Sequence, residues 1–184
     1  MADVSVRTAT AADAHAIAQV QSAAWRQAYS KLLPSDVLDR LDDPATAEEW
    51  RAAVTDPPLP AYRVLVATAG TDVVGFASFG PAVDSDLDDG VDAEITGLSV
   101  LPDHRGGGHG SRLVAATVDH LRADGFASAS AWLAEPGGPD DDVHRFLGGA
   151  GWAEDGGCRE LDLRGDGTLV VAQVRLRTSL GSTT

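Results

Sequence analysis

The chain has 184 residues, 43% of them hydrophobic, and its 14 Lys and Arg against 28 Asp and Glu give a formal net charge of −14 at pH 7. This length predicts one domain over residues 1–184 with a core of its own, and the charge argues against nucleic acid or an anionic membrane as the main partner. No run is long and apolar enough to span a membrane. A single cysteine, Cys158, and an N-terminus without the segments of a secretion signal predict a cytoplasmic location.

The first part of the chain predicts a strand and then two helical regions. Residues 4–7 form a short strand, and a helix begins near Thr10, where Asp13 three residues later completes a capping box. Residues 36–41 and 46–54 form the second helical region, which is interrupted near Pro44 and ended by the prolines of 56–60. Helical spacing gives the first helix a buried stripe and an adjacent face, made respectively of Ile17, Val20, Ala24 and Ala28, and of Gln21, Trp25 and Tyr29.

Two β-rich runs and an acidic segment follow. Residues 63–69 and 73–79 are separated by three turn-forming residues, which predicts a hairpin. The segment 84–92 then carries a dense set of aspartates. A calcium loop starting at Asp84 would need Gly at its sixth position and Glu at its twelfth, but these positions hold Asp89 and Ile95. We therefore expect a solvated loop there and no calcium site.

The stretch 93–123 carries the strongest functional signal. It reads as a buried strand over 93–100, a loop with four glycines introduced by Arg105, and a helix with one apolar face. Glycines that open a helix leave backbone N–H groups unpaired at the positive end of the helix dipole, so the loop predicts a phosphate site. A nucleotide-binding Walker loop would need Lys and then Ser or Thr after Gly110, and a dinucleotide fingerprint would need Gly in place of Ser111. Neither motif fits.

The last third predicts another strand, a short helix and two more strands. The strand covers 127–133, and the aspartates at 140–142 cap a helix that carries Phe146 and Leu147 and ends at Gly151. Residues 159–163 and 169–177 are the last two strands. His104 and His109 are not spaced with other ligands, and we expect no metal.

The loop and its surroundings resemble one known family. Arg-x-x-Gly-x-Gly, read from Arg105 through Gly108 to Gly110 after the strand end at 100–102, resembles the acetyl-CoA-binding motif of the GNAT acyltransferase superfamily. The sequence 93–95 looks like that family's fourth strand, and the segments 25–34, 151–152 and 174–177 are also similar to GNAT proteins. The resemblance implies an α+β fold with a twisted, mostly antiparallel mixed sheet flanked by helices. It also implies an N-acetyltransferase that uses acetyl-CoA and an amine acceptor.

Carried over residue by residue, the resemblance assigns a site. The fourth and fifth strands would splay apart, so that the backbone of the fourth strand pairs with pantetheine while the loop holds the pyrophosphate. Glu94 would be the general base, often acting through water; the alternative is a structural ion pair with an arginine such as Arg63. Trp25 and Tyr29 would border the acceptor, or simply pack. The cofactor-binding residues so assigned are Leu98, Ser99, Val100, Arg105, Gly106, Gly107, Gly108, His109, Gly110 and Ser111.

The sequence departs from the family where a general acid is expected. Leu147 stands where many members have a tyrosine, and a longer segment over 135–142 replaces a turn that contains asparagine. His144, Tyr29 or solvent could reprotonate the thiolate instead. This departure keeps open a CoA-binding or regulatory protein without catalysis, and acetylation of protein N-termini or lysines is a further alternative.

The acceptor is predicted from charge alone. The acidic segments 84–92 and 140–142 favour a small cationic amine as the acceptor. The sequence leaves open whether the protein is a monomer or a homodimer.

Overall fold

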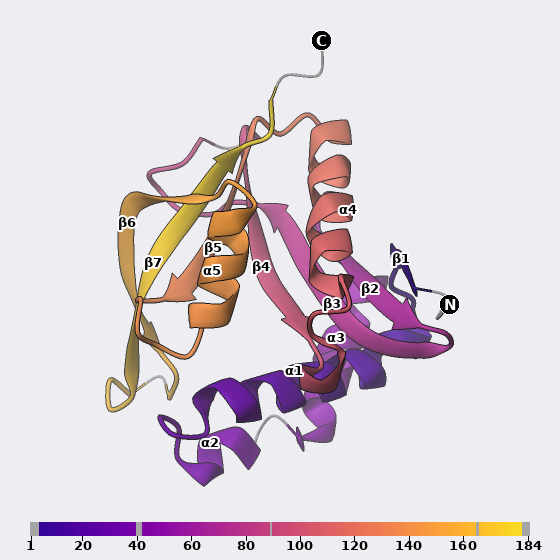
Figure 1. Ribbon diagram of the computed structural model, residues 1–184, viewed down its shortest axis with the longest axis vertical. Helices are drawn as coiled ribbons and strands as arrows, with labels where there is room; N and C mark the ends of the chain where they lie inside the picture. The colour runs from indigo at the N-terminus through magenta and orange to yellow at the C-terminus, as the bar shows by residue number, and fades with distance from the viewer. Residues whose placement is uncertain (1–3, 40–41, 89, 165, 182–184) are drawn as a thin grey trace.

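The computed structural model describes residues 4–39, 42–88, 90–164 and 166–181 (Figure 1). Within these residues one strand is followed by three α-helices, three strands, an α-helix, a strand, an α-helix and two strands, in nearly the order that the sequence predicts. The last two positions of the predicted helix 36–41 lie outside the described residues. The elements are β1 (Val4–Thr8), η1 (Ala11–Asp13), α1 (Ala14–Tyr29), α2 (Ser35–Asp39), α3 (Pro44–Thr55), β2 (Arg63–Ala69), β3 (Asp72–Pro81), β4 (Asp92–Val100), η3 (Pro102–His104), α4 (His109–Ala123), β5 (Ser128–Ala134), α5 (Asp141–Gly149), β6 (Ala153–Asp162) and β7 (Val170–Ser179).

The strands form one sheet in the order β1-β2-β3-β4-β5-β7-β6. Neighbouring strands pair antiparallel, except that β4 and β5 run parallel. This arrangement confirms the predicted mixed, mostly antiparallel sheet of an α+β fold. The strand predicted at 159–163 is longer than expected and begins at Ala153, where it pairs with Arg177 of β7.

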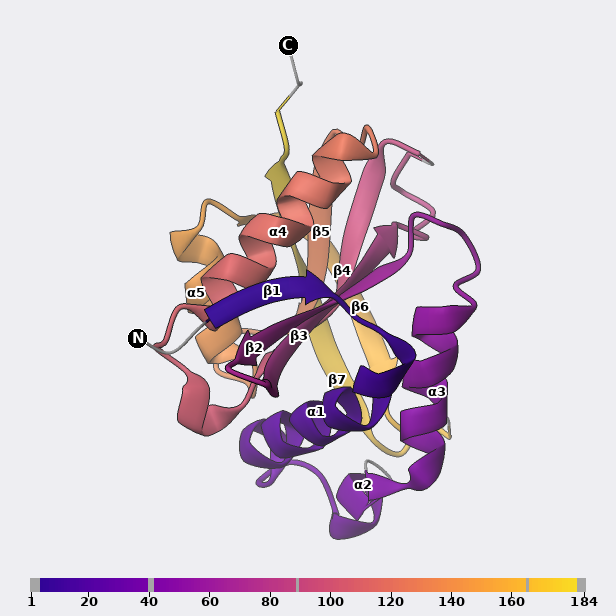
Figure 2. The same cartoon turned by 90° about the vertical axis from the view of Figure 1, so that its right-hand side faces the viewer.

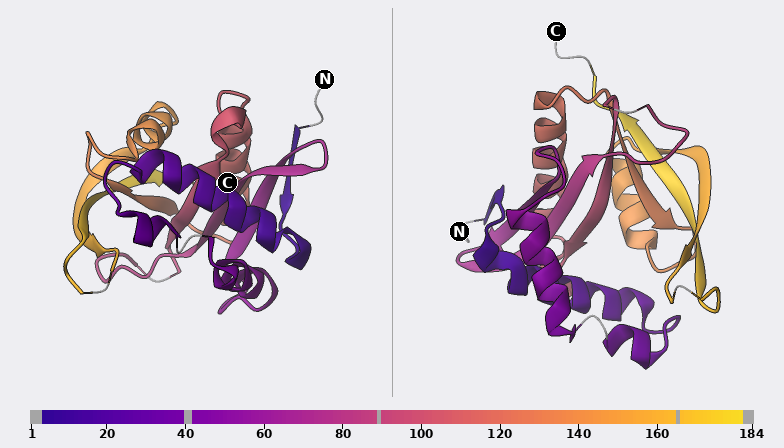
Figure 3. Two further views of the ribbon diagram at one scale, coloured as in Figure 1. Left: turned by 90° about the horizontal axis from the view of Figure 1, so that it is seen from below. Right: turned by 180° about the vertical axis from the view of Figure 1, so that it is seen from behind.

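Helices cover both faces of the sheet because β2 is apolar on both faces (Figures 2 and 3). Leu65 and Ala67 belong to the larger core, which also holds Leu113 and Leu121 of α4. The intervening Val64 and Val66 belong to a second core with α1, formed by Ile17 and Val20 and bordered by Trp50 of α3. Successive strand residues point to opposite faces, so α4 covers one face while α1 and α3 cover the other. Within the described part of the chain, no helix is long and apolar enough to cross a membrane.

An irregularity in β4 opens the sheet. Ser78 pairs with Gly97 while Phe79 pairs with Ile95, so Thr96 is an extra residue on β4. Such a bulge bends its strand and increases the local twist. Pairing of β4 with β5 covers 92–95 and ends at Ile95, and Figure 1 shows the two strands diverging from there. The splayed strands that the resemblance predicted are therefore present.

Candidate active site

A cleft of about 1150 Å³ lies where β4 and β5 diverge. Its walls come from α1, the end of β4, the glycine loop, β5, α5 and the last two strands. The predicted site residues that line it are Trp25, Tyr29, Glu94, Leu98, Ser99, Val100, Arg105, Gly106, Gly108, His109, Gly110 and Ser111. Gly107 is not among the lining residues, so the structure brings together every predicted site residue but one.

Glu94 faces the cleft but is largely withdrawn from water. It is 7% exposed, and its neighbours Ala93 and Ile95 belong to the core on the other face. Burial raises the pKa of this carboxyl, and the charge of Asp84 adds to the rise, while Arg159 and Arg175 oppose it. A raised pKa suits a carboxylate to accept a proton near neutral pH.

The alternative of a structural ion pair with Arg63 is wrong. Arg63 binds Asp124 with both terminal nitrogens, one of them at 3.0 Å. Among the described residues, the effects on Glu94 are burial and longer-range charges, with no hydrogen bond to its carboxylate. Glu94 is thus a buried carboxylate whose two oxygens are available to water or a ligand at the cleft.

The glycine loop takes the shape of an anion site. Gly106 and Gly108 have φ of +76° and +80°, a conformation that side chains disfavour, and Gly108 is the N-cap of α4. The N–H groups of the first turn of α4 therefore have no carbonyl partner within the helix. Arg112 Nη1 donates to the carbonyl of Gly107 at 3.1 Å and so braces the loop from behind. Arg105 lies at the rim of the cleft, 3.8 Å from Asp142.

His109 supports this loop from inside. The residue is 5% exposed, and its buried Nδ1 atom has no hydrogen-bond partner in the described part of the chain. Burial lowers the pKa of His109, and the nearby His104 lowers it further. The ring is therefore neutral at neutral pH. A Cβ built on Gly107 would stand 3.1 Å from this ring, which explains why that position is a glycine.

Trp25 and Tyr29 form one aromatic wall. Their rings stack with centroids 4.9 Å apart, and the Tyr29 hydroxyl donates to Asp140 at 3.0 Å. The same Asp140 oxygen accepts from the backbone N–H of Ala134 at 2.9 Å. Asp140 precedes α5, but its side chain does not cap that helix as predicted, because it ties α1 to β5 instead.

The candidates for a general acid are narrowed by these contacts. Leu147 is 1% exposed and belongs to the core. His144 does not line the cleft, and its Nε2 atom lies 3.1 Å from Glu154 of β6. Burial and the adjacent Asp140 carboxylate raise the pKa of Tyr29. A tyrosinate beside a carboxylate is unfavourable, so Tyr29 is a poor proton donor.

The acidic segment 84–92 is largely exposed, as its composition predicts, but three of its aspartates contact residues of the sheet. Asp86 accepts from both terminal nitrogens of Arg175, at 2.9 and 2.6 Å. Asp84 accepts from Trp132 Nε1 at 2.9 Å. Asp92 is 2% exposed and binds Arg177. Asp86 and Asp92 pair with Arg175 and Arg177 of β7, and these pairings offset the cost of burying the side chains of Arg175 and Asp92.

Several cleft residues were not predicted. Trp132, Arg159 and Gln173 line the side nearest β6 and β7, and Trp50 Nε1 donates to Gln21 Oε1 at 2.8 Å near α1. Nothing local in the sequence marks Trp132, Arg159 and Gln173, because these three residues meet only through the order and register of the last strands. Alternation along β5, which places Ser130 and Trp132 on one face, is the single signal that could have suggested Trp132.

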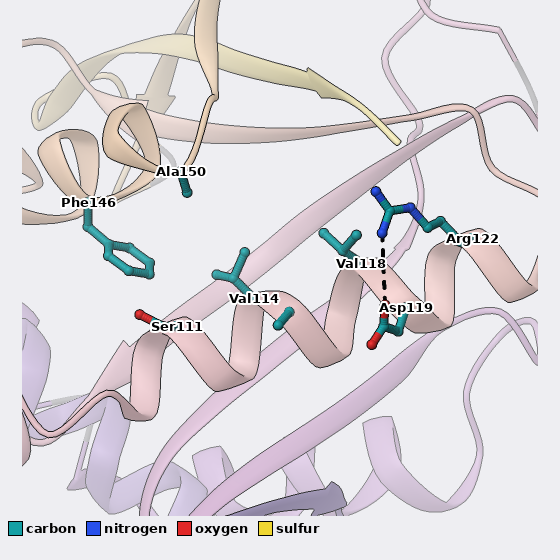
Figure 4. Close-up of a pocket in the computed structure, with 8 residues that line it drawn as sticks. Ser111, Val114, Val118, Asp119, Arg122, Phe146 and Ala150 are labelled. Atoms are coloured by element: carbon teal, nitrogen blue, oxygen red, sulfur yellow. Dashed lines mark ion pairs between the residues drawn. The ribbon is translucent and has the colours of Figure 1, made fainter. Parts of the chain in front are cut away.

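A smaller hollow of about 330 Å³ lies between α4 and α5 (Figure 4). Its wall is apolar and includes Val114, Val118 and Phe146, and the Asp119–Arg122 ion pair at 3.9 Å closes one end. Ser111 and Phe146 line both this hollow and the main cleft. These two residues border both spaces beside the glycine loop.

Comparison with known proteins agrees with this geometry. The acetyltransferase (GNAT) family model matches residues 19–148. The uncharacterized N-acetyltransferase YuaI of Bacillus subtilis is 31% identical over 132 residues, which cover 72% of each chain. PaiA N-acetyltransferase of Thermoplasma acidophilum, solved in complex with coenzyme A, superposes with a TM-score of 0.72 at 12% identity, over 96% of this chain and 99% of that one. For yncA of Salmonella typhimurium, solved with its cofactor acetyl-CoA, the TM-score is 0.64 at 22% identity, and the match covers 97% of this chain and 94% of that one. The chain belongs to the GNAT family of N-acetyltransferases.

Proposed function

We propose that the protein transfers the acetyl group of acetyl-CoA directly to the primary amine of a small molecule, with Glu94 as the general base. The observation that carries the proposal is the buried carboxylate of Glu94, which opens onto the same cleft as the glycine loop. A base and an anion site at two parts of one cleft suit a reaction that transfers a group from a phosphate-bearing donor to an amine.

The residues of the cleft fit acetyl-CoA. Beyond Ile95 the edge of β4 that faces β5 has no strand beside it, so the backbone of 98–100 can pair with the amides of pantetheine. The loop offers the first N–H groups of α4 to the pyrophosphate, and Arg105 adds a positive charge. Built on Gly110, a Cβ would lie 3.6 Å from Phe146 and 4.0 Å from Val100, inside this binding path.

The chemistry then assigns one task to each group. Acetyl-CoA supplies the thioester. The amine nitrogen forms a bond to the thioester carbonyl carbon, the C–S bond breaks, and the proton of the amine passes to Glu94, directly or through water. A backbone N–H at the strand gap stabilises the oxyanion. Solvent returns a proton to the thiolate, since neither Leu147 nor His144 can donate one in the cleft.

The acidic segments that favoured a cationic acceptor are partly engaged by other residues of the protein. Asp84, Asp86 and Asp92 contact arginines or Trp132. Asp140 is bound by Tyr29 and Ala134. Carboxylates that are already paired attract a cation weakly. The proposal therefore keeps a small primary amine as the acceptor. The charge of that acceptor has to be inferred from other residues of the cleft.

The experiment measures thiol release from acetyl-CoA with a panel of amines, peptides and protein N-termini, beside calorimetric binding of CoA. We expect turnover with small amines, and its loss in Glu94→Gln while CoA still binds. Turnover that persists in Glu94→Gln would remove the base assignment. Tight CoA binding without turnover on any acceptor would remove the proposed reaction, and absent CoA binding would remove the assignment of the loop.

A further inference from the structure

The part of the cleft along β6 holds an arginine whose terminal nitrogens donate no hydrogen bond among the described residues. Arg159 lines the cleft with Trp132 and Gln173. Its Nε donates to Gln173 Oε1 at 2.8 Å, and its guanidinium carbon lies 4.3 Å from the centroid of the Trp132 ring. These two contacts fix the plane of the guanidinium and leave the two terminal nitrogens at its free end.

The two arginines on the neighbouring strand β7 already donate hydrogen bonds to other side chains. All three side-chain nitrogens of Arg175 donate to Asp86 or Asp155, and Arg177 binds Asp92 and Ser128. The nearest carboxylate to Arg159 among the described residues is Asp84, at 4.0 Å. Asp84 also accepts from Trp132 and lies 3.5 Å from Arg175. At 4.0 Å the contact with Arg159 is too long for a hydrogen bond.

Arg159 and Glu94 act on one another across the same cleft. The charge of Arg159 opposes the rise in the pKa of Glu94 that burial causes, which places the two groups within electrostatic range. They stand on strands separated by β5 and β7, and Trp132 of β5 lies between them in the sheet. A small molecule held between the two charged groups would rest against an aromatic ring.

We propose that the acceptor is a small amine that also carries a carboxylate, which binds to the terminal nitrogens of Arg159 while its amine is held at Glu94. The inference rests on the proposed function and names its substrate class. A guanidinium with two free N–H groups in one plane matches the two oxygens of a carboxylate. Such a molecule is neutral overall, so the net charge of −14 does not repel it.

The other arginines of the cleft do not offer the same site. Arg105 and Arg145 line the side near the glycine loop and α5. Arg105 lies 3.8 Å from Asp142, and Arg145 also pairs with Asp142. Their position suits the phosphates of the donor, whereas Arg159 lies on the side of the cleft near β6, where no donor group is assigned.

The test compares matched amines that differ in the carboxylate. Initial rates with acetyl-CoA are measured for leucine beside leucinamide, β-alanine beside its amide, and γ-aminobutyrate beside butylamine. We expect at least one carboxylated amine to have a kcat/KM well above that of its partner. Leucinamide is the less basic amine and holds more of the reactive neutral form, so that pair is biased against the proposal.

Variants of Arg159 identify the residue responsible. In Arg159→Gln we expect KM for the carboxylated amine to rise by about 10- to 100-fold, the worth of a charge-assisted hydrogen bond. KM for the partner without a carboxylate should not rise, CoA binding should be unchanged, and Arg159→Lys should recover part of the loss. Arg51→Gln removes an equal charge from α3, outside the cleft, and should change neither amine.

Each result decides the inference. Equal use of acids and amides by the wild-type protein would overturn the carboxylate and leave the proposed function standing. A preference that survives in Arg159→Gln, with the fold checked by thermal unfolding, would overturn the role of Arg159. Failure to acetylate any amine would overturn the proposed function and this inference with it.

Discussion

Replacing Arg175 with methionine tests whether the segment 84–92 is held by the sheet or left free to attract an acceptor. The Arg175 side chain is 5% exposed and donates to Asp155 at 2.8 Å and to Asp86 at 2.9 and 2.6 Å. Methionine keeps an unbranched apolar side chain at this position and removes the charge. Asp84 and Asp155, which are 17% and 19% exposed, then lose a counter-ion that little water can replace.

The expected loss of stability follows from how much of the cluster is buried. Removing one partner of a fully buried ion pair costs about 3–5 kcal/mol. Here Asp86 is 62% exposed and returns to water, so most of the cost comes from Asp84 and Asp155. We expect a loss of about 2–3 kcal/mol, below the fully buried value. For a chain of this size that corresponds to a fall in Tm of about 4–12 °C.

Thermal unfolding followed by circular dichroism measures the effect, with Arg51→Met as a control on an exposed arginine. Hydrogen bonds from Arg175 lower the pKa of Asp86. The contribution of the ionised Asp86 carboxylate to stability is therefore present above the pKa of that group in the unfolded chain and is lost as the pH falls through its folded pKa. The difference in Tm between Arg175→Met and wild type should narrow in acid. An unchanged Tm, together with a raised KM for cationic amines in Asp86→Asn, would refute the structural role of the segment.

Three further predictions concern the base, the loop and acid stability. Glu94→Gln should lower kcat by about 10²- to 10⁴-fold. Because burial raises the pKa of Glu94, the fold loses stability as the pH rises through that pKa, so the variant should melt above wild type at neutral pH; a lower Tm there would contradict the argument. Gly110→Ala should leave Tm unchanged, since its Cβ would make an ordinary 3.6 Å contact with Phe146, but should weaken CoA binding about tenfold in calorimetry; unchanged affinity would remove Gly110 from the site. Hydrogen bonds from Arg7 lower the pKa of Asp13 from 3.8 to about 2. The ionised carboxylate therefore stabilises the fold fully above pH 3.8, and this stabilisation is lost as the pH falls from 3.8 to about 2. Acid titration of unfolding should show that loss in wild type and not in Asp13→Asn.

Elements that depend on local chemistry could be predicted from the sequence. The Asp13 carboxylate accepts from the backbone and the hydroxyl of Thr10, as the predicted capping box requires. Pro44 begins α3, a position where the missing N–H costs nothing. Gly70 turns the predicted hairpin with φ of +62°. In each case the residue and its effect lie within a few positions of one another.

Contacts that depend on strand order could not be predicted. Asp86 and Arg175 are 89 positions apart and meet because β7 lies between β5 and β6 in the sheet. From the sequence alone each of these charged side chains is expected to face water, because the sequence does not show which residue pairs with a given carboxylate. Arg159 and Trp132 escaped notice for the same reason. Glu94 could be proposed because a resemblance singled it out, while its lack of a hydrogen-bonding partner is visible only in the structure.

The charges on this face of the sheet argue for an acceptor of both signs. Arg175 and Arg177 are neutralised by carboxylates of 84–92 and by Asp155. At the cleft, Glu94 has no ion pair among the described residues, and the ion pair of Arg159 with Asp84 is long at 4.0 Å. Keeping a cation and an anion apart beside an aromatic ring is costly, because each could be stabilised by the other. A ligand with an amine at one end and a carboxylate at the other satisfies both charges at once. A purely cationic ligand would leave Arg159 unsatisfied and meet its repulsion, which is the physical reason to expect discrimination.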